Sequence, residues 1–387
     1  MTDRHTKSRI DWVSESCRLL AQIEAEFART KPFQDLTIGT GIHLEPKTAV
    51  LLRTLHSGGA RIVATGNLNS TQPETVRYLL EHGVEVTAEQ TIDHEVHDLS
   101  LNQIIAEQPD LLLDNGGDLF AVYAESPYPG LIGGTEETTS GRMRLEPMRA
   151  ELQRPILVIN DSPIKQFAEN RHAVGQSMFE SYMRVTNRST NGKRVTVFGY
   201  GACGRGVAAC FRNAHSVVSV VDADPVKALE AHLDGFSTPL RPDAIRSADV
   251  IVTETGAVNV IAAGDIEHFK DGVILMNGGH FPTEIAVGDL TDSAMVVRRD
   301  QFEELEIESL RLKDGRAVHI VSGGHMANLA GPRPLGNSIE SMDLGFALQA
   351  RCLEYIAQGR ATKADCVVPV PNAIDADIAN AYLALNR

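Results

Sequence analysis

A glycine-rich run in the middle of the chain constrains its fold more than any other feature. Residues 195–206 read Val-Thr-Val-Phe-Gly-Tyr-Gly-Ala-Cys-Gly-Arg-Gly, an apolar strand followed by a glycine turn and the start of a helix. In this pattern Gly199 permits the tight turn, Gly201 lets the backbone approach a pyrophosphate, and Gly204 lets the helix pack on the strand. The phosphates then lie at a helix N-terminus, where free N–H groups favour negative charge.

The sequence after this run favours a dinucleotide site over a tight turn in some other α/β sheet. A second apolar strand at 216–221 ends at Asp222, about 20 residues past the glycines. A carboxylate there accepts a hydrogen bond from a ribose 2′-hydroxyl and repels a 2′-phosphate, so we expect NAD rather than NADP. The residues expected to contact NAD here are Gly199, Gly201, Ala202, Cys203, Gly204 and Asp222.

Bulk composition limits the partners and the number of domains. A chain of 387 residues is longer than one typical domain. Its net charge of −15 opposes nucleic acid or an anionic membrane as a partner. No apolar run approaches the ~20 residues of a membrane helix, and the first seven residues do not resemble a signal peptide. The five cysteines include no Cys-x-x-Cys pair, so we expect a cytoplasmic protein with reduced thiols, no disulfide and no metal site.

Strands and helices alternate along the first 170 residues. A helix is predicted over 70–82, with Ser70 as its hydroxyl cap. Alternation of this kind indicates a parallel sheet covered by helices on both faces. The predicted strands lie at 60–65, 84–87, 111–114 and 155–160.

A second α/β unit surrounds the glycine run, with a helix predicted at 173–187 and strands at 194–198, 217–221, 249–253 and 273–276. The helix at 343–356 is expected to return to the first domain. We therefore predict two doubly wound parallel-sheet domains, with the active site in the cleft between them. The predicted boundaries are a substrate-binding domain at 1–172 completed by 333–365, a Rossmann NAD-binding domain at 173–332 inserted into it, and a short C-terminal segment at 366–387.

Polar residues follow several of these strands, at the ends where ligands gather in parallel sheets. Each cluster alone is typical of helix caps and turns. Together they favour a site with a lysine, a histidine and carboxylates beside NAD, which suits proton abstraction and hydride transfer. The clusters are residues 67–72, 114–118, 135–140, 160–165 and 277–281.

These clusters resemble the motifs of one family, the S-adenosyl-L-homocysteine hydrolases, in the short form common in archaea and some bacteria. The likeness covers nearly the whole chain. The matching segments are 43–49 (H-L-E-P-K-T-A), 65–72 (against T-G-x-N-P-L-S-T-Q, one residue shorter), 136–141 (E-E-T-T-S-G), 160–165 (N-D-x-x-x-K), 199–206 (G-Y-G-x-x-G-R-G) and 276–281 (M-N-G-G-H-F).

The resemblance implies an internal redox cycle on a nucleoside. NAD⁺ oxidises the sugar 3′-hydroxyl, the ketone acidifies the 4′-proton, and the resulting enolate expels the 5′ substituent; in the hydrolases water then adds and the ketone is reduced. The implied catalytic residues are Lys165 and Glu169 for the 3′-hydroxyl proton, Glu137 for the ribose hydroxyls, His43 for the 5′ leaving group and His280 beside the nicotinamide. The implied substrate contacts are Glu45, Lys47, Asn67, Ser70, Thr71, Gln72 and Asp118. The further NAD contacts are Thr138, Thr139, Ser140, Asn170, Thr253, Thr255, Gly279 and Asn328.

Three departures from the family pattern stand out. Asn115 replaces the second aspartate of D-D-G-G-D, the family's candidate acid/base at the 5′ position, and an amide cannot accept a proton at neutral pH. The loop 331–338 lacks the family's Gly-His pair, which lines the base pocket. The sequence ends at Arg387, short of a family tail that reaches the neighbouring subunit's NAD, so we expect weaker NAD retention.

These departures favour a lyase or dehydratase that removes a 5′ substituent from a modified nucleoside of the nucleoside-antibiotic type. Two alternatives stay open: a true hydrolase of S-adenosyl- or S-inosyl-homocysteine, and a non-catalytic NAD-binding regulator. The resemblance also implies a homo-oligomer, a dimer or tetramer. We expect the apolar faces of 174–185 and 343–356 to supply its contacts.

Overall fold

The computed structural model describes residues 7–87 and 90–387, so the prediction about the first seven residues lies almost wholly outside it. The chain forms two compact units. Unit 1 comprises Met1–Gln166 and Ile339–Arg387, and unit 2 comprises Phe167–Ser338. Unit 2 is thus inserted into the sequence of unit 1. The divisions fall after 166 and 338 rather than after 172 and 332, and the C-terminal segment is part of unit 1.

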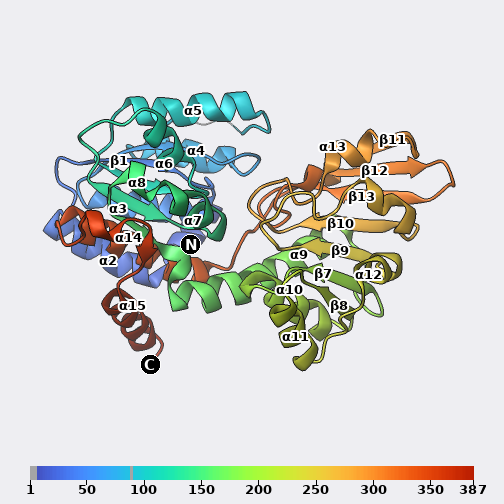
Figure 1. Cartoon of the computed structure of the whole chain (residues 1–387). Coiled ribbons are helices and arrows are strands. Elements are labelled where there is room, and N and C mark those ends of the chain that lie inside the picture. Colours follow the sequence, from blue (N-terminus) through green and yellow to red (C-terminus); the bar gives the residue numbers. More distant parts are fainter. Residues whose placement is uncertain (1–6, 88–89) are drawn as a thin grey trace, which may run out of the picture. The chain divides into compact units, whose positions relative to one another are not determined.

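A seven-stranded parallel sheet forms the centre of unit 1 (Figure 1). The parallel pairing places the carboxyl ends of its strands at one edge. In spatial order the strands are β14 (Val368–Pro369), β6 (Ile156–Val158), β5 (Gly133–Glu136), β4 (Leu111–Asp114), β1 (Thr37–Gly41), β2 (Arg61–Thr65) and β3 (Glu85–Val86).

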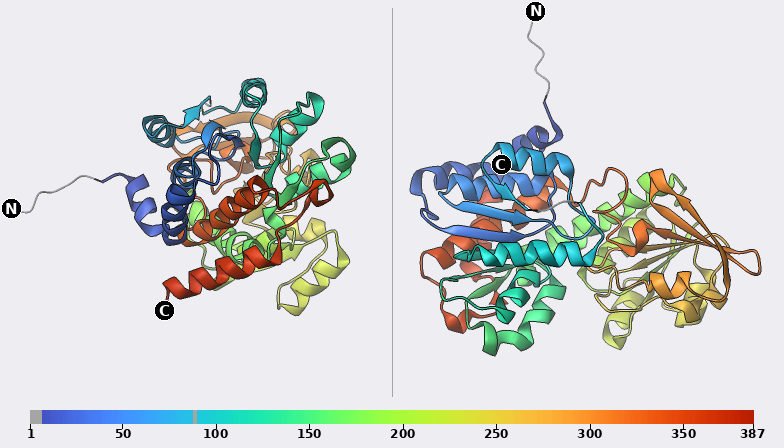
Figure 2. Two further views of the ribbon diagram at one scale, coloured as in Figure 1. Left: turned by 90° about the vertical axis from the view of Figure 1, so that its left-hand side faces the viewer. Right: turned by 90° about the horizontal axis from the view of Figure 1, so that it is seen from above.

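Helices cover both faces of this sheet (Figures 1 and 2). One group, α2, α3 and α14, packs together, and α5 packs with α6 as a second group. The bounds are α1 (Arg9–Ser16), α2 (Arg18–Thr30), α3 (Pro46–Ser57), α4 (Pro73–Glu81), α5 (His94–Ala106), α6 (Asp118–Glu125), α7 (Thr139–Leu145), α8 (Arg149–Leu152), α14 (Ile339–Ala357) and α15 (Asn372–Leu385).

The prediction that Ser70 caps a helix is wrong. Helix α4 begins at Pro73, and Gln72 is its N-cap residue. Proline suits the first helical position because the N–H it lacks has no partner within the helix. The Ser70 hydroxyl instead donates to the Asn67 carbonyl, at 3.0 Å.

Unit 2 has a seven-stranded mixed sheet. Five strands are parallel, and β12 and β11 extend the sheet as an antiparallel pair that the sequence did not predict. Strand β7 lies between β8 and β9, so the strand order reverses there. In spatial order the strands are β11 (Val296–Phe302), β12 (Ile307–Leu312), β13 (Ala317–Val321), β10 (Val273–Asn277), β9 (Val250–Thr253), β7 (Arg194–Phe198) and β8 (Val217–Val221).

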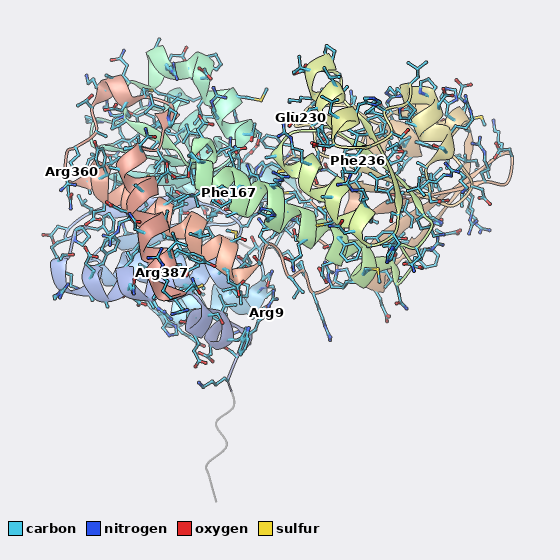
Figure 3. All side chains as sticks on the ribbon, turned by 90° about the horizontal axis from the view of Figure 1, so that it is seen from below. Arg9, Phe167, Glu230, Phe236, Arg360 and Arg387 are labelled. Atoms are coloured by element: carbon cyan, nitrogen blue, oxygen red, sulfur yellow. The ribbon has the colours of Figure 1, made fainter. Side chains whose placement is uncertain are left out.

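Alternate residues of these strands face two apolar layers of unit 2. Val195 and Val197 lie in one buried cluster and Phe198 in the other. Phe236 belongs to the first cluster (Figure 3). The Arg212 guanidinium lies 4.1 Å from the centre of its ring. The helices of this unit are α9 (Val174–Thr186), α10 (Ala202–Asn213), α11 (Pro225–Leu233), α12 (Arg241–Ser247) and α13 (Val287–Thr291).

The apolar faces that were expected to make subunit contacts are core instead. Val174, Met178, Tyr182 and Val185 are buried in the same cluster as Phe211 of unit 2. Most apolar residues of α14 are likewise buried, and Ile339, Tyr355 and Ala357 are partly exposed. These two faces are therefore taken up within the chain. Among the described helices, none has both the length and the apolar character to cross a lipid bilayer.

Candidate active site

Five neighbouring strands of the unit 1 sheet each end in a polar side chain that the sequence predicted for the site. Because all five are parallel, these side chains gather along one edge of the sheet. In spatial order they are Asn67 after β2, His43 after β1, Asn115 after β4, Glu137 after β5 and Lys165 after β6.

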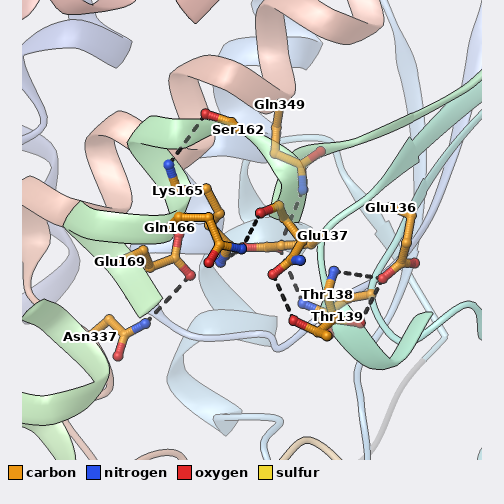
Figure 4. A network of polar contacts seen from close by, with 12 residues as sticks. Glu136, Glu137, Thr138, Thr139, Ser162, Lys165, Gln166, Glu169, Asn337 and Gln349 are labelled. Atoms are coloured by element: carbon orange, nitrogen blue, oxygen red, sulfur yellow. Dashed lines mark hydrogen bonds and ion pairs between the residues drawn. The ribbon is translucent and has the colours of Figure 1, made fainter. Parts of the chain in front are cut away.

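The Glu137 carboxylate is the centre of this group. Its Oε1 lies 3.3 Å from Lys165 Nζ, and its Oε2 accepts from Gln349 Nε2 at 3.3 Å (Figure 4). The same Oε2 accepts from Asn115 Nδ2 at 3.2 Å. Two amides and one ammonium therefore hold the buried carboxylate in a fixed orientation. A carboxylate held in this way can accept hydrogen bonds from the hydroxyls of a sugar.

The Asn115 amide is engaged at both ends. Its Nδ2 donates to Glu137, and its Oδ1 accepts from Asn67 Nδ2 at 3.3 Å. The hydrogen bonds continue from the Asn67 carbonyl to the Ser70 hydroxyl, which lies 2.6 Å from His43 Nδ1. Asn115 thus joins the His43 end of the site to Glu137 without carrying a charge of its own.

Two buried acids, Asp114 and Glu136, lie beneath the site as register partners on β4 and β5. Glu136 accepts from the N–H groups of Gly116 at 3.1 Å and Gly117 at 3.0 Å. Burial raises the pKa of Glu136 well above its usual range, and burial raises the pKa of Asp114 to about 7. Their hydrogen bonds fix the two loops that present Asn115 and Glu137.

The hydroxyls of the 138–140 loop belong to the same network. Thr138 Oγ1 accepts from Gly141 N at 2.8 Å, which caps α7, and donates to Glu136 Oε1 at 2.7 Å. It lies 3.1 Å from Ser140 Oγ, and Thr139 Oγ1 donates to Asn160 Oδ1 at 2.9 Å. The loop predicted to contact NAD is thus also tied to β5 and β6.

The remaining predicted substrate residues of unit 1 are Glu45, Lys47, Thr71, Gln72 and Asp118. Glu45 and Lys47 form a buried ion pair with 2.7 Å between Oε2 and Nζ. The enclosed Thr71 hydroxyl has no partner within the described chain. Gln72 Oε1 accepts a hydrogen bond from Arg9. Asp118 forms an ion pair with Arg144, and one of its carboxylate oxygens lies 3.8 Å from His97 Nε2. Asp118 is therefore already paired with the Arg144 guanidinium.

The glycine turn of unit 2 fits the pyrophosphate of NAD. Gly199 has a φ of +95°, and a Cβ on Gly204 would lie 2.0 Å from the Gly199 carbonyl oxygen, so both positions need glycine. No described atom lies within 4 Å of a Cβ built on Gly201, which starts α10 without a side-chain cap from the described residues. The N-terminus of α10 is therefore not capped by a side chain of the described residues, and such a helix end suits a phosphate.

Asp222 lies at the end of β8, beside this turn. Its Oδ2 accepts from Tyr200 N at 2.6 Å, and its Oδ1 accepts from Asp224 N at 2.8 Å. These bonds fix the carboxylate next to the glycines, where it suits a ribose diol.

Other predicted residues of unit 2 lie after β9 and β10. Thr253 Oγ1 donates to Asn277 Oδ1 at 3.1 Å, which also accepts from Gly279 N at 2.8 Å. Thr255 donates to Glu284 through both N and Oγ1, at 2.9 and 2.7 Å. These contacts hold the ends of the two strands in a fixed arrangement.

The last group comes from the flanking segments of unit 2. The Asn328 amide donates to Ser177 Oγ at 3.0 Å, and the His280 ring packs edge-on against Phe281. Glu169 and Asn170 lie on a π-helix, Lys165–Ala173. Such turns are frequent at functional sites.

Sequence reasoning gave no individual role to three residues of the unit 1 site, Asp114, Glu136 and Gln349. A signal was available for Gln349. With Phe346, Leu353 and Ile356 it occupies helical spacing on the buried stripe of α14, where an amide is out of place unless it has a partner.

Comparisons with known proteins give matches over most of the chain. The family model for S-adenosyl-L-homocysteine hydrolase matches residues 5–128, and the model for the NAD binding domain of that family matches residues 170–333. An adenosylhomocysteinase of Thermotoga maritima is 37% identical over 97% of this chain and 93% of its own length. An S-inosyl-L-homocysteine hydrolase of Methanothermobacter thermautotrophicus is 36% identical over 97% and 91%. An adenosylhomocysteinase of Pyrococcus abyssi is 38% identical over 97% and 89%.

Proposed function

We propose that this chain, which belongs to the S-adenosyl-L-homocysteine hydrolase family, oxidises the 3′-hydroxyl of a nucleoside and eliminates its 5′ substituent. Family membership makes it an NAD-dependent enzyme with a fold of two α/β units. Family membership alone does not specify the substrate or the fate of the product that elimination leaves. We assign them from the site on unit 1 and from the departures in the sequence.

The oxidation step is assigned to Glu137 and Lys165. NAD, when bound, supplies an acceptor for the hydride of the sugar carbinol and returns that hydride at the end of the cycle. Glu137 binds the ribose hydroxyls, and Lys165 exchanges the 3′-hydroxyl proton, because its Nζ lies 3.3 Å from the carboxylate that holds the sugar. Glu169 and His280 are assigned to the same hydroxyl and to the nicotinamide side, as the family motifs imply.

The fate of the product is assigned from Asn115, the observation that carries the proposal. Its amide is held between Asn67 and Glu137 and cannot exchange a proton at neutral pH. An acid/base group typically contributes 10²–10⁴-fold to rate. Proton abstraction at C4′ depends on the ketone and is unaffected, whereas addition of water at C5′ is slow. The enzyme therefore acts as a lyase or dehydratase on a modified nucleoside.

A second candidate function is hydrolysis of S-adenosyl- or S-inosyl-homocysteine. The observation in its favour is the names of the relatives, which are hydrolases of these compounds and share 36–38% of their residues with this chain. In that case His43, linked to Asn115 through Ser70 and Asn67, activates the water instead.

Replacing the lysine tests the assigned chemistry. We expect Lys165→Ala to abolish NADH formation on mixing with nucleosides while NAD binding is unchanged, because Lys165 lies in unit 1 and the glycine turn in unit 2. Lys313→Ala, at an exposed lysine, is the matched control. NADH formation at the wild-type rate in Lys165→Ala would move the proton exchange to another group, with Glu169 next in line.

A further inference from the structure

Glu254 has no role in anything described so far, yet its side chain is unusually placed. It follows β9 directly, and its Oε1 is enclosed without a hydrogen-bond partner within the described chain. A Cβ built on Gly278 would lie only 1.9 Å from this oxygen. The Glu254 side chain therefore crosses from the end of β9 to the end of β10 and occupies the space that a side chain at 278 would fill.

The surroundings of Glu254 favour the uncharged acid. Burial raises the pKa of Glu254 well above its usual range, and the nearby Glu284 carboxylate raises it further. Glu284 accepts from Thr255 N and Oγ1 and from Gly256 N, at 2.7–2.9 Å, so its own oxygens are already satisfied. An uncharged carboxyl has one donor and one acceptor to offer, and an orphaned buried oxygen of this kind calls for a partner.

The fold indicates which ligand group lies at this position. A dinucleotide binds across the point where the strand order reverses, here between β8 and β9 on either side of β7. Asp222 at the end of β8 takes the adenosine ribose, so the nicotinamide half extends over the ends of β9 and β10. Those ends carry Glu254 and Gly278.

We propose that Glu254, as an uncharged acid, pairs with the carboxamide of the nicotinamide ring. Its O–H donates to the carboxamide oxygen, and its carbonyl oxygen accepts from the carboxamide NH₂. Glutamine at 254 would keep one donor and one acceptor, whereas alanine would remove both. This inference rests on NAD binding and does not depend on the proposed reaction.

Calorimetric titration of the nucleotide-free full-length protein tests the pairing. The ligands are NAD⁺, its 3-acetylpyridine analogue, which lacks the carboxamide NH₂, and ADP-ribose, which lacks the ring. Wild type should bind NAD⁺ about three- to tenfold tighter than the analogue, the value of one net hydrogen bond. Glu254→Ala should lose that preference, Glu254→Gln should retain it, and ADP-ribose should bind all three proteins equally. Glu308→Gln, at a buried carboxyl on β12, is the matched control.

Three results would overturn the proposal. Equal binding of NAD⁺ and the analogue by wild type would do so without any variant, even if Glu254→Ala failed to fold. An equal loss in Glu254→Gln and Glu254→Ala would show that the charged carboxylate is the required form. A loss of ADP-ribose affinity in Glu254→Ala would show a general packing role.

Discussion

Replacing Asn115 with aspartate adds an acid/base group at the position from which we derive slow water addition. The amide nitrogen of Asn115 lies 3.2 Å from Glu137 Oε2. A carboxylate oxygen in its place would repel Glu137 by about 5 kcal/mol at an effective dielectric constant of 20. That energy corresponds to nearly four pKa units. Lys165 already neutralises Glu137 from the other side and reduces the repulsion only in part.

The two carboxyls of Asn115→Asp should therefore share one proton at neutral pH, and the new carboxyl can pass that proton to a leaving group or take one from water. We expect the steady-state release of homocysteine from S-adenosylhomocysteine, which continues only as fast as water addition lets the cycle close, to rise by about tenfold to a hundredfold. That rise is the lower part of the usual acid/base contribution. The variant still carries the loop 331–338, which departs from the family pattern and limits the gain.

The assay is thiol detection of homocysteine, with NADH absorbance recorded on the same samples. Asn115→Ala is the control, since it removes the amide without adding an acid, and it should show no rise. The reasoning fails if Asn115→Asp forms NADH normally and yet releases no more homocysteine than wild type. An equal rise in Asn115→Ala would refute it as well, because the gain would then come from space rather than from proton transfer.

Three further predictions test other parts of the account. Asp222→Ala should weaken the binding of NAD about tenfold and reduce the protein's preference for NAD over NADP, since the ribose diol loses its acceptor. Equal binding of both cofactors by the wild-type protein would contradict the assignment. Gln349→Ala should slow NADH formation about fivefold by removing one donor to Glu137, and Gln349→Glu should slow it more, whereas equal effects would point to packing alone. Asp114 has a pKa raised to about 7 in the folded protein against 3.8 for the ordinary group, so the folded state binds more protons. The free energy of unfolding in urea should accordingly fall as pH rises, by about 3 kcal/mol between pH 5 and 8; an equally steep fall in Asp114→Asn would assign the effect to other groups.

The local sequence pattern was sufficient to predict the buried strands that consist of a continuous apolar run. The residues of β7 and β8 match the predicted ranges because each strand is apolar and is bounded by turn residues. Strand β11 was missed because most of its residues are exposed and polar, with no alternation for the sequence to show. Its pairing with β12 is an antiparallel tertiary contact that the local sequence does not encode.

The site residues also divide into those that the sequence indicates and those that depend on tertiary contacts. Asn67 follows a strand that the sequence predicted, so its place at the sheet edge follows from the topology of a parallel sheet. Glu137 follows β5, for which no strand was predicted, and only the family resemblance indicated its role. Glu254 could not be predicted, because Thr-Glu-Thr-Gly is typical of an exposed turn. Its enclosure depends on Gly278, a residue of the next strand end, so it appears only when β9 and β10 are paired.

The central claim is that the enzyme oxidises and eliminates but adds water slowly. The most direct measurement mixes NAD-loaded protein with S-adenosylhomocysteine and follows NADH absorbance and homocysteine release together. The account predicts that NADH and about one equivalent of homocysteine per active site appear in a rapid first phase, because elimination releases the thiol before water adds, and that homocysteine release then continues at far less than about one turnover per second. Homocysteine release at about ten turnovers per second, a typical enzymatic rate, would contradict it and establish an ordinary hydrolase.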